Sequence, residues 1–327
     1  MTSKTLARLA LGILLSLTGA LNAVAEDGPA KQLFGAQPLP STGAPVSTGF
    51  YAKGCLGGGV ALPVDGPAWQ VMRLSRNRRW GHPRMIALLE RLAREAAAKD
   101  GWPGLLVGDI SQPRGGPMLT GHASHQVGLD ADIWLTPMPK RLYSAEERET
   151  VEAKSMLKGD TLLVDPDKWS KSRTALLKRA ASYPEVERIF VHPGIKKKLC
   201  DTVSGDRGWL AKIRPYWGHY YHFHVRIKCQ PGSPNCKAQD PTGSDDGCGK
   251  PLAWWFTEEP WKKAPTPTKP KITMLSDLPK QCARILHAPG PQSVEDVTYG
   301  IGTQLAAPMP AADEDSPADV AVPRQRP

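Results

Sequence analysis

The stretch HYYHFHVRIKC, residues 219–229, alternates apolar and polar side chains from Tyr221 onward. Side chains two positions apart in a β-strand point to the same face of the sheet. The pattern therefore predicts a strand with one apolar and one polar face. The apolar face carries Tyr221, Phe223, Val225 and Ile227, and the polar face carries His222, His224, Arg226 and Lys228. His222 and His224 should project side by side into the same space.

A second polar stretch, GHASHQVGLDADIWL, occupies residues 121–135. Its second half predicts another half-buried strand, because Asp130 and Asp132 alternate with apolar residues. The glycine-bracketed loop before this strand carries His122 and His125 near the same edge. Five of the eight histidines of the chain lie in these two stretches.

An imidazole, a carboxylate and a distant imidazole form a common set of zinc ligands. Three protein ligands leave the fourth position open, as a catalytic zinc requires. The competing interpretation is structural, since a single histidine is more often hydrogen-bonded than metal-bound and His-x-His alone is a weak motif. The combination of both stretches favours the metal. The sequence contains no Gly-x-Ser-x-Gly nucleophile motif.

The first residues, 1–25, resemble a secretory signal peptide. Lys4 and Arg8 form the charged start, an apolar run follows from Leu9 to Leu21, and Ala23-Val24-Ala25 is a small-residue cleavage site. An uncleaved anchor is the alternative, although the apolar run is short for a membrane span. We expect the mature chain to begin near Glu26 and to work in the periplasm.

The net charge of the chain is positive. It falls from +10 to +8 on removal of the leader, because Lys4 and Arg8 leave with it. A basic exported protein is attracted to anionic partners such as wall polymer, a membrane surface or nucleic acid. The sequence lacks the zinc-finger and aromatic motifs of nucleic-acid binding, so nucleic acid is not expected as a partner. No segment after the leader is apolar and long enough to predict a transmembrane helix.

The six cysteines suggest disulfides in an exported chain, and six cysteines allow 15 pairings. One pair is favoured on local grounds, because CQPGSPNC places Cys229 and Cys236 at the two ends of a turn. The spacing of the other four leaves their pairing open. We expect these bridges to stabilise the fold rather than to take part in chemistry.

The remaining pattern predicts a single α+β domain, with a central antiparallel sheet flanked by helices and long loops and stapled by disulfides. Residues 82–101 predict a helix that begins at Pro83 and ends before Gly101. Residues 170–183 predict another helix. GLLVGDIS and VERIFVHP predict buried strands. Residues 26–54 are rich in Gly, Pro, Ser and Thr and predict an irregular arm.

Composition divides the chain into four parts. The leader, residues 1–25, precedes a folded domain at 26–262, which carries both histidine stretches. Residues 263–302 form a Pro- and Lys-rich linker and a segment that Cys282 ties back to the body. Residues 303–327 have few large apolar side chains and are expected to be a disordered tail.

The two histidine stretches together resemble the penicillin-insensitive murein endopeptidases, which belong to the lysostaphin-type and D-Ala-D-Ala metallopeptidases. The similarity extends over most of residues 45–285. It includes GHP at 81–83, RIFVHPGIKKKLC at 188–200 and all six cysteines. The resemblance implies hydrolysis of the D-alanyl–meso-diaminopimelyl crosslink of peptidoglycan, which would be the partner of the protein.

The resemblance also implies roles for individual residues. Zinc would be bound by His125, Asp132 and His224, with His122 as a supplementary ligand. His222 would act as general base or stabilise the oxyanion, and His219 would lie near the substrate. The cysteine pattern implies Cys55–Cys282, Cys200–Cys248 and Cys229–Cys236.

Some other residues in or beside the two stretches each have two interpretations. Asp130 either orients a ligand imidazole or is a structural carboxylate. The aromatic residues Trp134, Trp217, Tyr220 and Tyr221 either line a substrate groove or, as sequence alone favours, pack in the core.

Two rival functions remain open at this point. A D,D-carboxypeptidase or D,D-dipeptidase would use the same zinc ligands on a different substrate. A non-catalytic wall-binding protein would keep the metal only as a structural element. The completeness of the ligand set argues against the second rival, and the similarity outside the two motifs argues against the first.

Overall fold

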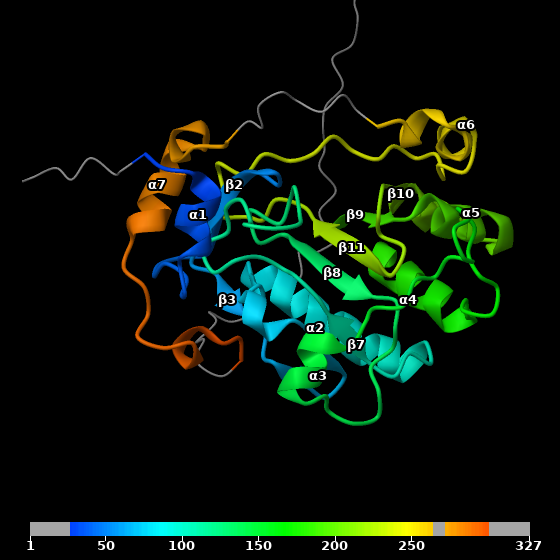
Figure 1. The fold of residues 1–327 in the computed structure, drawn as a ribbon, viewed down its shortest axis with the longest axis horizontal. Coiled ribbons are helices and arrows are strands. Elements are labelled where there is room, and N and C mark those ends of the chain that lie inside the picture. Colours follow the sequence, from blue (N-terminus) through cyan, green and yellow to red (C-terminus); the bar gives the residue numbers. More distant parts are fainter. Residues whose placement is uncertain (1–26, 264–271, 301–327) are drawn as a thin grey trace, which may run out of the picture.

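A seven-stranded mixed sheet forms the centre of the computed structural model, which describes residues 27–263 and 272–300 (Figure 1). The strand order is β10-β9-β11-β8-β7-β5-β4. The strands are β4 (Asp65–Gly66), β5 (Trp69–Val71), β7 (Leu105–Val107), β8 (Asp130–Trp134), β9 (Val186–Val191), β10 (Ile213–Pro215) and β11 (His222–Ile227). The predicted α+β class is therefore confirmed.

The centre of the sheet is antiparallel, as predicted. β11 pairs antiparallel with both β8 and β9, and β8 pairs antiparallel with β7. The outer pairs β10–β9 and β7–β5 are parallel, which makes the whole sheet mixed. Both histidine-rich stretches thus contribute neighbouring central strands, so their polar faces lie side by side.

The opposite face of the two central strands is apolar and fully covered. Ala131 and Ile133 of β8 and Phe223 and Val225 of β11 belong to one buried core. Helices α2 (Pro83–Lys99) and α4 (Lys171–Ser182) lie beside the sheet (Figure 1). Their leucines belong to the same core. The sequence predicts both helices and both strands within about two residues of these bounds. With one face of the sheet closed by helices, only the polar face is left for a site.

The smaller elements surround this core. The other helices are α1 (Ala30–Gly35), α3 (Ala145–Thr150), α5 (Pro193–Thr202), α6 (Lys250–Ala253) and α7 (Lys280–His287). Short 3₁₀ helices are η1 (Leu74–Arg76), η2 (Gly208–Lys212), η3 (Trp254–Phe256), η4 (Glu259–Trp261), η5 (Leu275–Asp277) and η6 (Glu295–Val297). Two two-stranded sheets pair β1 (Val46–Phe50) with β2 (Lys53–Gly57) and β3 (Val60–Ala61) with β6 (Trp80–Gly81).

The expectation of an irregular arm at residues 26–54 is wrong. This segment contains α1 and the hairpin of β1 and β2. Composition misleads here because β1 is held by polar contacts with distant residues. The hydroxyl of Ser47 donates to the carbonyl of Val127 at 2.7 Å, and its backbone N–H donates to the hydroxyl of Ser233 at 3.0 Å. Gly49, at φ +85°, leaves no room for a Cβ beside the carbonyl of Lys53.

Three disulfides connect Cys55–Cys282, Cys200–Cys248 and Cys229–Cys236, as the resemblance implies. The first bond ties α7 to β2. Arg114 strengthens the attachment, because its guanidinium donates to the carbonyls of Ile285, Leu286 and Ala288 at 2.6–2.9 Å. The segment around Cys282 is thus bound to the body, as expected.

Several sequence-based expectations concern residues outside the described part of the chain. The leader at 1–25, the centre of the Pro- and Lys-rich linker at 264–271 and the tail at 303–327 all fall there. Within residues 27–263 and 272–300, no helix combines the length and apolarity of a membrane span.

Candidate active site

The pairing of β8 with β11 brings the two histidine-rich stretches together. Asp132 lies opposite His224, and Asp130 lies opposite Arg226. Side chains of directly opposite residues lie close together on one face of an antiparallel pair. The imidazole Nδ1 of His224 is 3.3 Å from Oδ1 of Asp132. The sheet register therefore places one predicted imidazole beside the predicted carboxylate.

The loop before β8 adds His125 to the same carboxylate. His125 has a left-handed backbone, at φ +67°, and its N–H donates to Oδ2 of Asp130 at 3.1 Å. Its ring Nδ1 lies 2.7 Å from the carbonyl of Ile110. A carbonyl only accepts, so Nδ1 carries a hydrogen, and Nε2 is the nitrogen that is left to face Asp132. This Nε2 is 3.4 Å from Oδ1 of Asp132.

Asp130 fixes the orientation of His224. Its Oδ1 lies 2.8 Å from Nε2 of that imidazole. Arg226 in turn donates hydrogen bonds to both oxygens of Asp130, from Nε at 2.7 Å and from Nη2 at 3.3 Å. The charged carboxylate favours the hydrogen on Nε2, so Nδ1 of His224 is left free to face Asp132. Of the two interpretations of Asp130, the one that orients an imidazole agrees with these contacts.

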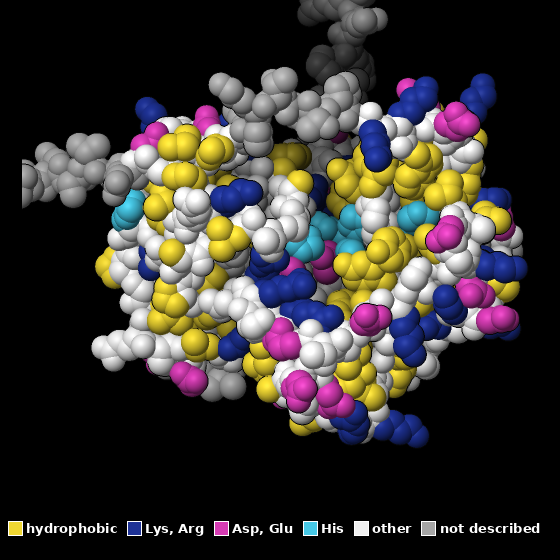
Figure 2. All heavy atoms as spheres, in the orientation of Figure 1, with side chains coloured by type: hydrophobic (Ala, Val, Ile, Leu, Met, Phe, Trp, Pro, Cys, Tyr) yellow, Lys and Arg dark blue, Asp and Glu magenta, His cyan; other side chains and the backbone are white. Residues whose placement is uncertain are grey.

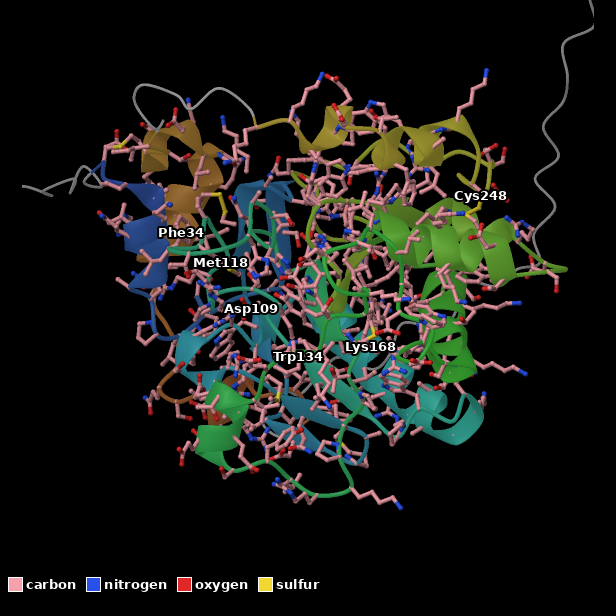
Figure 3. All side chains as sticks on the ribbon, turned by 45° about the vertical axis from the view of Figure 1, so that its right-hand side comes forward. Phe34, Asp109, Met118, Trp134, Lys168 and Cys248 are labelled. Carbon is pink, nitrogen blue, oxygen red and sulfur yellow. A yellow bond between two sulfur atoms is a disulfide. The ribbon has the colours of Figure 1, made fainter. Side chains whose placement is uncertain are left out.

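His122 completes the cluster from the side of the loop. Its Nδ1 lies 3.5 Å from Oδ2 of Asp132, and its Nε2 lies 2.9 Å from Oδ2 of Asp109. Asp109 is a residue that sequence reasoning missed. It is the second residue after β7 and is buried (Figure 3). Nη1 of Arg78 lies 2.9 Å from the same oxygen. A lone acid at the end of an apolar strand, as in GLLVGD, is the signal that could have identified it.

The two remaining histidines, His219 and His222, lie next to each other at the border of this cluster. Nε2 of His222 is 3.6 Å from Oδ2 of Asp132. His219 has a left-handed backbone, at φ +56°, and its Nδ1 is 2.7 Å from the carbonyl of Trp217. The ring centroid of His219 lies 4.8 Å from that of His222 and 5.8 Å from that of His224. Structure and sequence thus agree that all five histidines meet at one place. Histidine atoms gathered near the centre of the face shown in Figure 2 mark this place on the surface.

Burial and charge shift the pKa of several of these groups. Burial alone would raise the pKa of Asp132, but the imidazoles of His222 and His125 lower it well below its ordinary range. Burial opposes the charge of His125, yet Asp132 raises the pKa of this imidazole to about 9. Burial lowers the pKa of His222 to about 4 and that of His224 to about 3. The cluster therefore combines an ionised carboxylate with imidazoles of differing proton affinity.

A divalent metal fits this set of atoms. His122, His125 and Asp132 each offer a ligand atom within 4.8 Å of the other two. Nδ1 of His224 also faces Asp132, although that three-residue group does not include it. Among the described residues, no hydrogen-bond partner reaches the buried atoms Nε2 of His125 and Oδ1 of Asp132. Orphaned buried polar atoms are costly, and a metal ion would satisfy both.

Two cavities open on either side of the histidine cluster, and His122 borders both. The first, here called the Arg76 cavity, has a volume of about 280 Å³. Its walls include Arg73, Arg76, Trp134, Glu152, Tyr221 and His222. The second, here called the Phe190 cavity, has a volume of about 380 Å³. Its walls include Phe50, Phe190, Tyr216, His219, His224 and Arg226. An extended substrate could thus cross the cluster from one cavity to the other.

The aromatic residues near the site are placed differently from what sequence favours. Trp134 is buried, as expected for core packing, but it also borders the Arg76 cavity. Tyr221 is half-buried and borders the same cavity. Trp217 and Tyr220 are 43% and 40% exposed, so the expectation that they pack in the core is wrong. The indole N–H of Trp217 donates to the carbonyl of Pro260 at 2.7 Å, and its ring packs edge-on against Trp255.

Comparison with known proteins shows that this chain is a peptidase. Residues 47–287 match the family described as penicillin-insensitive murein endopeptidase, and the chain belongs to this family. The relative of that name from Haemophilus influenzae is 46% identical over 258 residues, which cover 77% of this chain and 87% of the relative. The one from Klebsiella pneumoniae is 39% identical over 244 residues, or 73% and 88% of the two chains. The one from Yersinia enterocolitica is 40% identical over 243 residues, with the same coverage.

The family resemblance noted from the two histidine stretches is therefore confirmed. The relatives carry the name of an enzyme that acts on murein, the cell-wall polymer. Three disulfides suit a protein that works in an oxidising compartment outside the cytoplasm.

Proposed function

We propose that this chain is a zinc-dependent DD-endopeptidase that hydrolyses the D-alanyl–meso-diaminopimelyl crosslink of peptidoglycan. One observation carries the metal part of the proposal. Nε2 of His125 and Nδ1 of His224 lie 3.4 Å and 3.3 Å from the same oxygen of Asp132, with their opposite nitrogens held by hydrogen bonds. Such preorientation of two imidazoles around a carboxylate is typical of zinc ligands.

In this proposal His125, Asp132 and His224 hold the zinc ion, and His122 supplements them. A zinc ion held there would polarise the scissile carbonyl and activate water for attack at neutral pH. Asp130 keeps the hydrogen of His224 on Nε2, so that Nδ1 always faces the metal position. Asp109 contacts Nε2 of His122, so that Nδ1 of this imidazole also faces the metal position.

His222 is proposed as the group that moves the proton. It lies beside Asp132 and borders the Arg76 cavity, and its Nδ1 has no hydrogen-bond partner among the described residues. A base in this position accepts a proton from the attacking water and passes it to the leaving nitrogen. His219, which borders the other cavity, is proposed to contact the acyl side of the substrate.

The organisation of the chain is part of the same proposal. Residues 1–25 direct export to the periplasm, and residues 26–262 form the zinc metallopeptidase domain. Residues 263–302 contain the segment that Cys282 anchors. The disulfides and the murein substrate named for the relatives support work in the periplasm.

The test separates this function from its rivals. Purified sacculi are digested with the protein, and the released muropeptides are analysed by mass spectrometry. The proposal predicts that crosslinked dimers disappear while uncrosslinked tetrapeptide monomers increase. Loss of terminal D-alanine alone would instead show a D,D-carboxypeptidase. Binding to sacculi without any cleavage would show a wall-binding protein.

A further inference from the structure

The Arg76 cavity and the Phe190 cavity differ in charge. Arg76 borders the first cavity, and 47% of its side chain is exposed. The only ionised basic side chain bordering the second cavity, among the described residues, is Arg226. That guanidinium is buried and bonded to Asp130 and to Oε1 of Gln239 at 2.6 Å. Only the first cavity therefore offers a cation that a ligand can reach.

The charge of Arg76 is only partly neutralised by its neighbours. Its Nη1 lies 3.2 Å from Oδ2 of Asp109. The same oxygen also accepts from Arg78 at 2.9 Å and contacts His122 at 2.9 Å. One carboxylate is thus shared by two guanidiniums and an imidazole, so it neutralises the charge of Arg76 only in part. Within residues 27–263 and 272–300 the other donors of Arg76 have no hydrogen-bond partner, so they can bind an anion bidentately.

The other charged residues of this cavity are less suited to the same task. Both terminal nitrogens of Arg73 donate to backbone carbonyls, those of Arg148 and Val151, at 2.8 Å each. Glu152 is exposed at the border of the cavity and repels an anion. An anionic group of a ligand is therefore expected to bind Arg76 and to avoid Glu152.

The position of His222 indicates which end of the substrate enters this cavity. His222 borders the Arg76 cavity, whereas His219 and His224 border the Phe190 cavity. Under the proposed function, His222 delivers the proton to the leaving nitrogen. A proton donor must lie within hydrogen-bond reach of that atom. The amine side of the scissile bond is therefore expected on the side of Arg76.

The chemistry of the crosslink supplies the matching anion. The scissile nitrogen belongs to an amino-acid centre of diaminopimelate, and the carbon that bears this nitrogen also bears a carboxylate. That carboxylate forms no other bond in a D-alanyl–diaminopimelyl crosslink. The acyl side contributes only the methyl group of D-alanine, which suits the apolar wall around Phe190 and Phe50.

We infer that Arg76 determines substrate specificity by binding the free carboxylate next to the scissile nitrogen of diaminopimelate. This inference rests on the proposed function and adds to it the direction in which the crosslink lies across the cluster. Arg76 is a binding residue here and takes no part in proton transfer.

The experiment uses two soluble crosslinked muropeptide dimers that differ at one group. In the first, the diaminopimelate carboxylate beside the scissile amide is free, and in the second it is a carboxamide. The kcat and KM of the full-length zinc-loaded protein are measured for both. The wild-type enzyme is expected to cleave the acid with a kcat/KM about 10 to 100 times higher, as for loss of one charged hydrogen bond.

Two substitutions with opposite expected effects sharpen the test. Arg76→Gln should lower kcat/KM about tenfold or more for the acid, mainly through KM, and change it less than threefold for the amide. Glu152→Gln should lower KM for the acid only. Arg94→Gln is the matched control, because Arg94 is an exposed residue of α2 that forms an ion pair with Glu90 on its own helix and does not border the Arg76 cavity.

The outcomes separate the inference from the proposed function. If Arg76→Gln lowers activity equally for both dimers, Arg76 merely supports Asp109 and His122 and the inference is wrong. The inference is also wrong if the wild-type enzyme cleaves both dimers equally well. If the wild-type enzyme cleaves neither dimer, the proposed function itself fails.

Discussion

Asp132 and His224 lie opposite each other on the paired strands β8 and β11, with Oδ1 of the carboxylate 3.3 Å from Nδ1 of the imidazole. This one cross-strand relationship joins the two halves of the site. A slip of one residue in the register would turn one of the two side chains to the apolar face. The antiparallel pairing at the centre of the sheet is therefore a requirement of the proposed chemistry.

Replacement of either proposed imidazole ligand should abolish both metal binding and hydrolysis. His125→Ala and His224→Ala each remove one nitrogen that faces Asp132. We expect less than a tenth of the wild-type zinc content and at least a hundredfold loss of kcat. Metal analysis and a muropeptide assay measure the two effects. His287→Ala, which changes an exposed histidine of α7, is the control. Full activity in either site variant would show that the ligands are assigned wrongly.

Asp130→Asn should weaken zinc binding without abolishing it. The carboxylate of Asp130 touches Nε2 of His224 and is paired with Arg226, but it does not face the centre of the cluster. Outer hydrogen-bond partners of metal ligands typically change metal affinity by 10 to 100 times. A zinc titration against a competing chelator should show a loss of this size, and much of the activity should return at saturating zinc. An unchanged zinc affinity would make Asp130 a purely structural carboxylate.

His82 and His192 should make the stability depend on pH. Each precedes a proline at the start of a helix, and each Nδ1 accepts a hydrogen bond from a backbone N–H, that of Arg84 or Gly194. Burial lowers the pKa of each from 6.5 to about 4, so the folded state favours the neutral ring. Their stabilising contribution is complete above pH 6.5 and is lost as the pH falls from about 6.5 towards 4.

The corresponding measurement is the free energy of unfolding between pH 4.5 and 7.5. Asparagine also accepts the capping hydrogen bond but does not titrate. His82→Asn should therefore reduce the fall in stability by up to about 1.4 kcal/mol per pH unit in this window. The exposed His287 supplies the control substitution, His287→Asn. Identical pH profiles for wild type and His82→Asn would contradict the capping role.

The sequence predicts the core and the site better than the periphery. The strands β8 and β11 follow from strict alternation, and α2 follows from its apolar stripe and its Pro83 start. Each of these signals is local. The hairpin of β1 and β2 could not be predicted in this way, since its small polar strand depends on contacts such as Ser47 with Val127. Asp109 was missed for the same reason, because its partners Arg78 and His122 are distant along the chain.

The three disulfides should contribute unequally to stability. Cys55 and Cys282 are 227 residues apart, whereas Cys229 and Cys236 are separated by 7. In the chain-entropy description, a bond that closes a longer loop restricts the unfolded state more strongly. Replacing both cysteines of the long-range pair by serine should cost about 3 kcal/mol more than replacing the short-range pair. Denaturant unfolding of the two double variants measures this difference. Equal losses would indicate that native-state contacts around α7 outweigh loop closure.

The zinc dependence of crosslink cleavage tests the central claim most directly. The purified protein is stripped of metal with a chelator, and its cleavage of crosslinked muropeptide dimers is followed as zinc is added back. The account predicts no monomer release by the stripped protein and recovery of full cleavage near one zinc ion per chain. Undiminished monomer release after complete removal of metal would contradict it.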